Sequence, residues 1–357
     1  MRTLTIRFAL FTSIAALLLV ACGAPQELDA EVDSGVSEPA WHRHRDAGHP
    51  DTVAPQTACE ATSPRTAPST VWSLPEAGEA PFVQVLGEAQ SSIRVFIYLM
   101  GYGAILDTLT AKAKAGVKVR VVMDSGKASV NQKYHDLLKA AGAEILWSDP
   151  KFPYMHAKVI IVDGKEALIS TGNFSKSYSI LLERNFLARV TDPEDVADLV
   201  ALFDADWEKR APDLTCTRLL VSPVNAKPRL LSLIGSAKST LTLESMQLAD
   251  SDVRASVAAR QAAGVQVRAI LADTAWIDAN ADAAAFLKAH AIEARYIPHC
   301  HVKAIVVDGD RAYLGSENMS YTSLVKNREV GVVLTEAAAV KVMADTFEKD
   351  WAVGQPF

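Results

Sequence analysis

The feature that most constrains the fold is a pattern that occurs twice with the same spacing. The two copies are "MHAKVIIVDGKEALISTGN" at 155–173 and "HCHVKAIVVDGDRAYLGSEN" at 299–318. They share a histidine, a lysine, an aspartate and an asparagine, which are His156, Lys158, Asp163 and Asn173 in the first copy and His301, Lys303, Asp308 and Asn318 in the second. In both copies the Lys follows the His by two residues, the Asp by seven and the Asn by seventeen. Such agreement indicates a duplicated structural unit.

The segments that precede the two copies also resemble each other. Residues 83–100 and 230–248 both have the pattern of a helix leading into a strand, and residues 113–125 and 261–274 both have that of a helix end, a Gly and a buried strand. Strands that alternate with helices predict an α/β fold with two similar lobes, each a mixed β-sheet flanked by helices. We expect these lobes at 78–210 and 211–357, with a functional site where they meet.

Each copy of the pattern predicts a strand, a tight turn and a returning strand. Residues two apart on a strand point to the same face, so each His lies beside the Lys that follows it. The Asp-Gly pairs at 163–164 and 308–309 are a strong hairpin signal. The returning strands then bring Thr171 and Asn173, or Ser316 and Asn318, to the same end of the sheet.

This arrangement suits a phosphorus centre that carries negative charge. Lysines supply compact positive charge, and Asn, Ser and Thr supply directional hydrogen bonds to oxygen atoms. One imidazole can attack phosphorus while the other protonates the leaving oxygen. A lone histidine would more simply be a core or surface residue, but two copies at matched spacing favour chemistry.

The pattern HxKxxxxD followed by GSxN resembles the phospholipase D superfamily from about residue 78 to residue 357. The second copy has Gly315, Ser316 and Asn318, whereas the first has Ser170 in place of the Gly. The resemblance implies a phospholipase D-like fold with its active site at the lobe interface, and a mechanism that needs no metal or other cofactor. It also implies that His156 is the nucleophile and His301 the general acid and base.

The resemblance further assigns the remaining site residues. The phosphate oxygens would be held by Lys158, Lys303, Thr171, Asn173, Ser316 and Asn318. Asp163 and Asp308 belong to the same pattern, although their place in turns favours a structural role. In the family a carboxylate usually orients each His; Glu329 fits this role in the second half, and Glu183 or Asn185 in the first.

The N-terminal residues indicate export. Arg2 and Arg7 precede an apolar run that ends in "LVAC", which predicts a lipoprotein-type signal at 1–22 with lipid on Cys22. Residues 23–77 lack helical or strand periodicity and are predicted to be a flexible linker. In an oxidising compartment Cys59 and Cys216 are the expected disulfide pair, with Cys300 free.

Three function classes follow from these observations. The leading hypothesis is an exported or membrane-anchored monomeric phospholipase D that hydrolyses phospholipids to phosphatidic acid and a head-group alcohol, with transphosphatidylation as a variant. A nuclease acting on DNA or RNA is the alternative, although the net charge of -6 argues against a nucleic-acid-coating protein. A binding protein without activity is disfavoured by the complete motifs. A cardiolipin-synthase-like transferase is a variant of the leading hypothesis, but no stretch after the signal is long and apolar enough to supply the membrane helices expected of one.

Overall fold

The computed structural model describes residues 59–357; the predicted signal, the lipidation site Cys22 and most of the predicted linker lie outside the described residues. The first lobe is built on a sheet with the strand order β1-β7-β6-β5-β2-β3-β4. Its strands are β1 (Thr70–Leu74), β2 (Ser92–Ile97), β3 (Lys118–Met123), β4 (Glu144–Trp147), β5 (Val159–Val162), β6 (Glu166–Ser170) and β7 (Asn185–Val190). Only β2, β3 and β4 pair in parallel within this sheet, which makes it mixed as predicted.

The second lobe repeats this plan in a sheet with the order β15-β11-β10-β9-β12-β13-β14-β8. Its strands are β8 (Leu220–Ser222), β9 (Thr240–Ser245), β10 (Gln266–Ala272), β11 (Glu293–Ile297), β12 (Lys303–Val307), β13 (Arg311–Gly315), β14 (Glu329–Leu334) and β15 (Gln355–Pro356). Here β9, β10 and β11 form the parallel part, at positions that match β2, β3 and β4. The prediction of an α/β fold with two similar lobes is confirmed.

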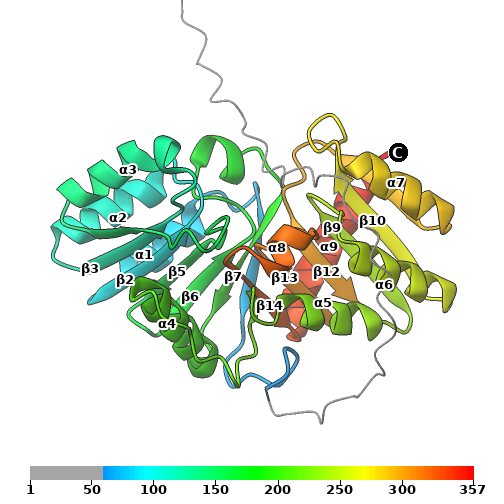
Figure 1. Ribbon diagram of the computed structural model, residues 1–357, viewed down its shortest axis with the longest axis horizontal. Helices are drawn as coiled ribbons and strands as arrows, with labels where there is room; N and C mark the ends of the chain where they lie inside the picture. The colour runs from blue at the N-terminus through cyan, green and yellow to red at the C-terminus, as the bar shows by residue number, and fades with distance from the viewer. Residues whose placement is uncertain (1–58) are drawn as a thin grey trace, which may run out of the picture. The chain divides into compact units, whose positions relative to one another are not determined.

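Helices cover both faces of each sheet (Figure 1). In the first lobe these are α1 (Ala80–Glu88), α2 (Ala104–Lys114) and α3 (Ala128–Ala140) on one face and α4 (Pro193–Trp207) on the other, with the π-helix η1 (Lys176–Ile180) before β7. In the second lobe α5 (Ala226–Gly235), α6 (Ser251–Ala262) and α7 (Asn280–Ala289) cover one face and α9 (Ala337–Val353) the other, with α8 (Tyr321–Val325) before β14. Among the described residues, none of the helices is both long and apolar enough to cross a bilayer.

Strand periodicity explains why both faces are covered. On β2, Ile93, Val95 and Ile97 belong to the apolar core beneath α1–α3. The alternate residues Arg94 and Phe96 face α4, where Arg94 pairs with Asp204 and Phe96 contacts Phe203. A strand with side chains buried on both faces requires helices on both sides.

The two Asp-Gly turns have the conformation that their sequence predicts. Asp163 and Gly164 have φ angles of 52° and 64°, and Asp308 and Gly309 have 52° and 70°. Positive φ at both central residues is the type I′ turn geometry, and the N–H groups of Lys165 and Asp310 close the two turns onto the carbonyls of Val162 and Val307. β5 and β6, and likewise β12 and β13, therefore pair as antiparallel hairpins.

The predicted linker boundary at residue 77 requires correction. β1 pairs with β7 along its whole length, so Thr70–Leu74 is part of the first sheet. Before it, Arg65 donates to Asp195 and to the backbone carbonyl of Val333. Edge pairing, an ion pair to the first lobe and a hydrogen bond to the second thus order residues whose own sequence shows no periodicity.

The structure joins Cys59 to Cys216 through a disulfide with a Cα–Cα distance of 4.9 Å, the pair that the sequence predicts. Cys300 is free and fully buried next to His301. The Cys59–Cys216 bond ties the segment before β1 to the segment that connects the lobes.

Candidate active site

His156 lies at the end of the first lobe that faces the second. It precedes β5, and its backbone N–H donates to the carbonyl of Arg328, at 2.9 Å. Its Nδ1 lies 2.7 Å from Oε2 of Glu329, the first residue of β14. Because a carboxylate only accepts, Nδ1 carries the hydrogen and Nε2 keeps its lone pair. The first His is therefore oriented by a carboxylate from the other lobe.

His301 has the corresponding position in the second lobe with a different partner. Its Nδ1 lies 3.0 Å from Oδ1 of Asn185, the first residue of β7, and 3.6 Å from Oε2 of Glu183. Asn185 also accepts from the hydroxyl of Thr171 and donates to the carbonyl of Ser179, which fixes its amide. An amide thus takes the place of the carboxylate that orients His156.

This arrangement corrects the assignment of the orienting residues to their own halves. Glu329, in the second half, contacts His156 of the first half, while Asn185 and Glu183, in the first half, contact His301 of the second. In the sequence each orienting residue follows the His-Lys pair of its own half. In the folded protein the two lobes pack so that each orienting residue contacts the histidine of the other half.

An arginine stands directly before each orienting residue, with Arg328 buried and Arg184 partly buried, and each contacts the other lobe. Arg328 donates its N–H to Tyr154 and accepts from His156 through its carbonyl, while its guanidinium pairs with Asp206 of α4 at 2.8 Å. In the mirrored arrangement, Arg184 donates its N–H to the carbonyl of His299 and pairs with Asp350 of α9 at 2.6 Å. Each arginine therefore fixes the backbone of the other lobe's His segment.

The two lysines of the motifs are fully buried beside their histidines. Lys158 Nζ donates to the carbonyl of His156 at 2.7 Å and lies 5.2 Å from the ring centre of Tyr98. Lys303 Nζ donates to the carbonyl of His301 at 2.8 Å and lies 3.2 Å from its imidazole nitrogens. The amino groups of both lysines are thus held out of bulk water where the two lobes meet.

The predicted amides Asn173 and Asn318 are both buried. Oδ1 of Asn173 has no hydrogen-bond partner among the described residues, and the backbone N–H of Asn318 donates to Ser323 at 2.9 Å. The side-chain N–H groups of such amides, together with lysine and imidazole N–H groups, are the donor types that can hold an oxyanion where the two lobes meet.

Two of the predicted phosphate-binding residues instead use their hydroxyls to support the framework. Thr171 donates to Asn185 Oδ1 at 2.8 Å and accepts from the N–H of Phe186 at 2.9 Å. The hydroxyl of Ser316 accepts from the N–H of Val330 at 3.0 Å. Because these hydroxyls are committed to β7 and β14, Thr171 and Ser316 position the orienting residues rather than bind phosphate.

Asp163 and Asp308 follow the far ends of β5 and β12, away from the histidines, where their contacts agree with the structural role that their place in turns favours. Asp163 accepts from the N–H groups of Gln90, Ser91 and Ser92, each at 2.8 Å. Burial raises the pKa of Asp163, but these donors outweigh it and bring the pKa to about 2. Asp308 makes the same contacts with residues 238–240. Both carboxylates fix the start of a neighbouring strand.

Three further residues of the site were not predicted from the sequence. The ring of Tyr98 packs 4.7 Å from the ring of His156, and Trp276 lies 6.2 Å from the ring of His301. Asp124, at the end of β3, accepts from the N–H of Met155 at 2.5 Å, and burial raises its pKa to about 6. These three residues follow the carboxyl ends of β2, β3 and β10. Because ligands bind beyond the carboxyl ends of parallel strands, this position could have indicated that they belong to the site.

Glu317 lies between Ser316 and Asn318 and forms a second buried carboxyl group near Glu329. The hydroxyl of Tyr313 donates to its Oε2 at 2.7 Å. Burial, together with the nearby charge of Glu329, raises the pKa of Glu317 to about 8. Glu317 is therefore protonated at neutral pH, which avoids a second charge beside the partner of His156.

No group of three or more His, Cys, Asp or Glu residues with metal-site geometry occurs within 59–357.

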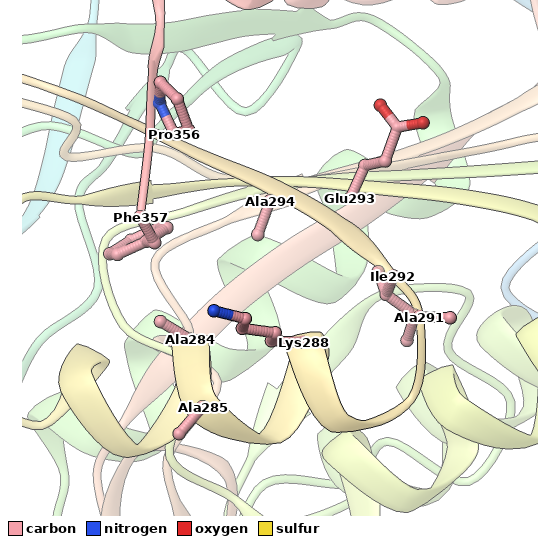
Figure 2. Close-up of a pocket in the computed structure, with 9 residues that line it drawn as sticks. All are labelled: Ala284, Ala285, Lys288, Ala291, Ile292, Glu293, Ala294, Pro356 and Phe357. Carbon is pink, nitrogen blue, oxygen red and sulfur yellow. The ribbon is translucent and has the colours of Figure 1, made fainter.

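A separate pocket lies between α7, β11 and the C-terminal segment (Figure 2). It is lined by Ala284, Ala285, Lys288, Ala291, Ile292, Glu293, Ala294, Pro356 and Phe357. This lining includes none of the candidate catalytic residues.

The duplicated geometry agrees with a comparison against protein families. The family model described as "Cardiolipin synthase, PLD-like domain" matches residues 82–207 and 230–351, one match in each lobe. The chain belongs to this phospholipase D-like family. Each match contains one His-Lys pair together with the residue that orients the histidine of the other lobe.

A curated relative has the same family name, and two solved structures have a similar fold. The probable cardiolipin synthase YwiE of Bacillus subtilis is 24% identical over 76% of this chain, and the match spans 64% of the relative's length. Polyphosphate kinase of Porphyromonas gingivalis has a TM-score of 0.64 at 18% identity, over 80% of this chain and 47% of that one. Phosphatidylserine synthase of Haemophilus influenzae Rd KW20 has a TM-score of 0.62 at 12% identity, over 81% of this chain and 86% of that one. The two structures share the fold with this chain.

Proposed function

We propose that this protein is a phospholipid phosphodiesterase that passes the phosphatidyl group through a phosphohistidine on His156. The observation that supports this most directly is the contact between Nδ1 of His156 and Glu329, at 2.7 Å between two fully buried groups. A carboxylate at Nδ1 raises the electron density at Nε2 and stabilises the positive charge that develops on the ring during attack. His301, with the neutral Asn185 at Nδ1, is better suited to giving up a proton.

In the proposed first step, Nε2 of His156 attacks phosphorus and the bond to the head-group oxygen breaks. Protonated His301 gives its Nε2 proton to that oxygen, so the alcohol leaves neutral. In the second step His301 takes a proton from water or from an acceptor alcohol, whose oxygen attacks phosphorus as the P–N bond breaks. Lys158, Lys303, Asn173 and Asn318 stabilise the negative oxygens in both steps.

The substrate class is inferred from the relatives and from charge. The curated relative carries the name of a cardiolipin synthase, and the net charge of -6 favours a lipid over a polyanionic nucleic acid as substrate. With water as acceptor the product is phosphatidic acid. The relative's name supports transfer to an alcohol as a second candidate activity of the same site.

The test is to incubate the purified protein with vesicles of phosphatidylcholine or phosphatidylglycerol, with and without ethanol. We expect phosphatidic acid without ethanol, phosphatidylethanol with it, and neither from His156→Asn. Single-stranded and duplex DNA are assayed in parallel. Cleavage of DNA with no lipid product would replace the proposal by a nuclease.

A phosphodiester with a nitrophenolate leaving group separates the roles of the two histidines. Nitrophenolate leaves without a proton, so His301→Asn should retain its release while it loses turnover of ordinary phospholipids. His156→Asn should lose both. If His301→Asn and not His156→Asn abolished the phosphohistidine trapped by rapid denaturation, the two roles would have to be exchanged.

For location, we propose that the protein is exported and anchored through lipid on Cys22. The lipobox-like "LVAC" at 19–22 motivates this proposal, and the linker after it would let the enzyme reach the membrane surface. Cys22→Ser should release the protein from the membrane fraction. Mass spectrometry that finds an unmodified mature N-terminus at another residue would contradict the anchor.

A further inference from the structure

Two adjacent leucines are exposed in the turn between η1 and β7. Leu181 is 45% exposed and Leu182 54%, and Tyr178 of η1 is 36% exposed beside them. The backbone of this turn is nevertheless well fixed: Leu181 N–H donates to Lys176, and Leu182 N–H donates to Tyr178. An ordered segment thus holds neighbouring apolar side chains in water, which is unfavourable unless another surface covers them.

The fold itself does not require leucine there. Leu182 stands three residues before Asn185, the partner of His301, and the residue three before Glu329 in the second half is Lys326. Both halves build the same supporting structure, yet only the first has an apolar side chain at this place. The counterpart of Leu181 is the apolar Val325, so Leu182 alone is a local addition to the duplicated plan.

The leucine turn lies at the rim of the His301 side of the active site. Arg184, two residues after Leu182, donates its N–H to the carbonyl of His299 at 2.9 Å. The exposed ring of His299 is 6.1 Å from Trp276, which in turn packs against His301. The same turn is tied to the catalytic centre through Asn185, whose amide donates to the carbonyl of Ser179 at 2.9 Å.

Tyr102 and two lysines lie around the start of η1, the helix that leads into the leucine turn. Gly101 N–H donates to the carbonyl of Phe174 at 2.8 Å, which places the loop of Tyr102, 61% exposed, against the segment that leads into η1. Lys133 lies 5.3 Å from the ring centre of Tyr102, and Lys176 is exposed on η1, 3.9 Å from Glu79. Exposed aromatic and aliphatic side chains with lysines beside them match the chemistry of a bilayer surface with anionic head groups.

We propose that Leu181 and Leu182, with Tyr178, insert into the phospholipid surface and bring the His301 side of the active site onto it. This inference rests on the proposed function for its biological meaning, because a substrate embedded in a bilayer has to reach a site at the seam. The occupant is the bilayer rather than a protein partner. The leucines enter the acyl boundary while Lys133 and Lys176 contact head-group phosphates.

The test uses the Cys22→Ser chain, so that lipid on Cys22 cannot hold every variant on the membrane alike. Flotation with phosphatidylglycerol-containing vesicles compares Leu181→Ser/Leu182→Ser with the control Val224→Ser/Val353→Ser, which removes two valines that are 51% and 68% exposed elsewhere. We expect at least tenfold weaker vesicle binding for the leucine variant and unchanged binding for the control. Equal binding of the two variants would overturn the inference.

Release of nitrophenolate from a soluble phosphodiester shows whether the site itself is intact. The leucine variant should keep this turnover while it loses turnover of vesicular phospholipid. Loss of the soluble reaction with unchanged vesicle binding would overturn the inference, because the leucines would then support the site. If neither the parent protein nor any variant converts phospholipid, the proposed function fails. Weaker flotation of the leucine variant than of the valine control would still support insertion of the leucines into the bilayer.

Discussion

The buried carboxyl group of Glu317 predicts a specific dependence of stability on pH. Burial and the charge of Glu329 raise its pKa from the ordinary 4.5 to about 8. Between these values the folded protein holds a proton that the unfolded chain releases. The stabilising contribution is complete below about pH 4.5, falls as pH rises, and is lost above about pH 8.

The size of the effect follows from the two pKa values. Each pH unit between them is worth about 1.4 kcal/mol, so the full range from 4.5 to about 8 corresponds to about 5 kcal/mol in the free energy of unfolding. Glu317→Gln keeps an oxygen that can accept from Tyr313 and carries no proton to lose. The free energy of unfolding of this variant should therefore rise relative to the wild type by up to about 5 kcal/mol over this range.

Urea unfolding at half-unit pH intervals from 4.5 to 8.5 measures this difference. The same substitution at Glu144, which is exposed on β4, is the matched control. The curves of Glu317→Gln and wild type should diverge with rising pH, whereas Glu144→Gln should follow the wild type. Parallel curves for Glu317→Gln and wild type would show that Glu317 is already ionised in the fold, and the argument from burial would be refuted.

Three other predictions concern the partners of the site. Glu329→Gln should lower kcat by about 10²- to 10⁴-fold with little change in KM, because His156 loses the carboxylate that orients it; a change confined to KM in steady-state assays would contradict this role. Asp206→Asn should lower the free energy of unfolding by about 3–5 kcal/mol, because it removes the charge that pairs with buried Arg328; an unchanged urea midpoint would show that the pair does not stabilise the lobe contact. Cys216→Ser should cost about 2–4 kcal/mol by opening a long loop, and equal midpoints for wild type with and without reductant would exclude a stabilising disulfide.

Much of the fold follows from local patterns in the sequence. The spacing from His to Asp sets the length of each central strand, and the Asp-Gly pairs at 163–164 and 308–309 set the hairpins. These features depend on residues close together in the chain, where periodicity and turn chemistry are informative. The strand β1 was missed because its order comes from pairing with β7 rather than from a pattern of its own.

The site was predicted less completely because its contacts link distant parts of the chain. His156 and Glu329 are separated by 173 residues, and nothing in the sequence near either one shows that the lobes exchange their orienting residues. The hydroxyls of Thr171 and Ser316 matched a phosphate-binding pattern, but their partners on β7 and β14 appear only in three dimensions. The tripeptides "ERN" at 183–185 and "NRE" at 327–329 could have indicated the orienting residues, because each places an arginine next to one of them.

The exchange of orienting residues makes the two halves dependent on each other. A fragment that ended after α4 would contain His156 without Glu329, and the remaining fragment would contain His301 without Asn185. Neither half could hold its imidazole in the working orientation, but two half-length chains that associate would supply each other's missing partner. One polypeptide therefore contains the arrangement of a two-fold symmetric dimer, in which each half supplies the residue that orients the other half's histidine. Because the two halves are parts of one chain, their orienting residues can differ, and here one histidine has a carboxylate partner and the other an amide.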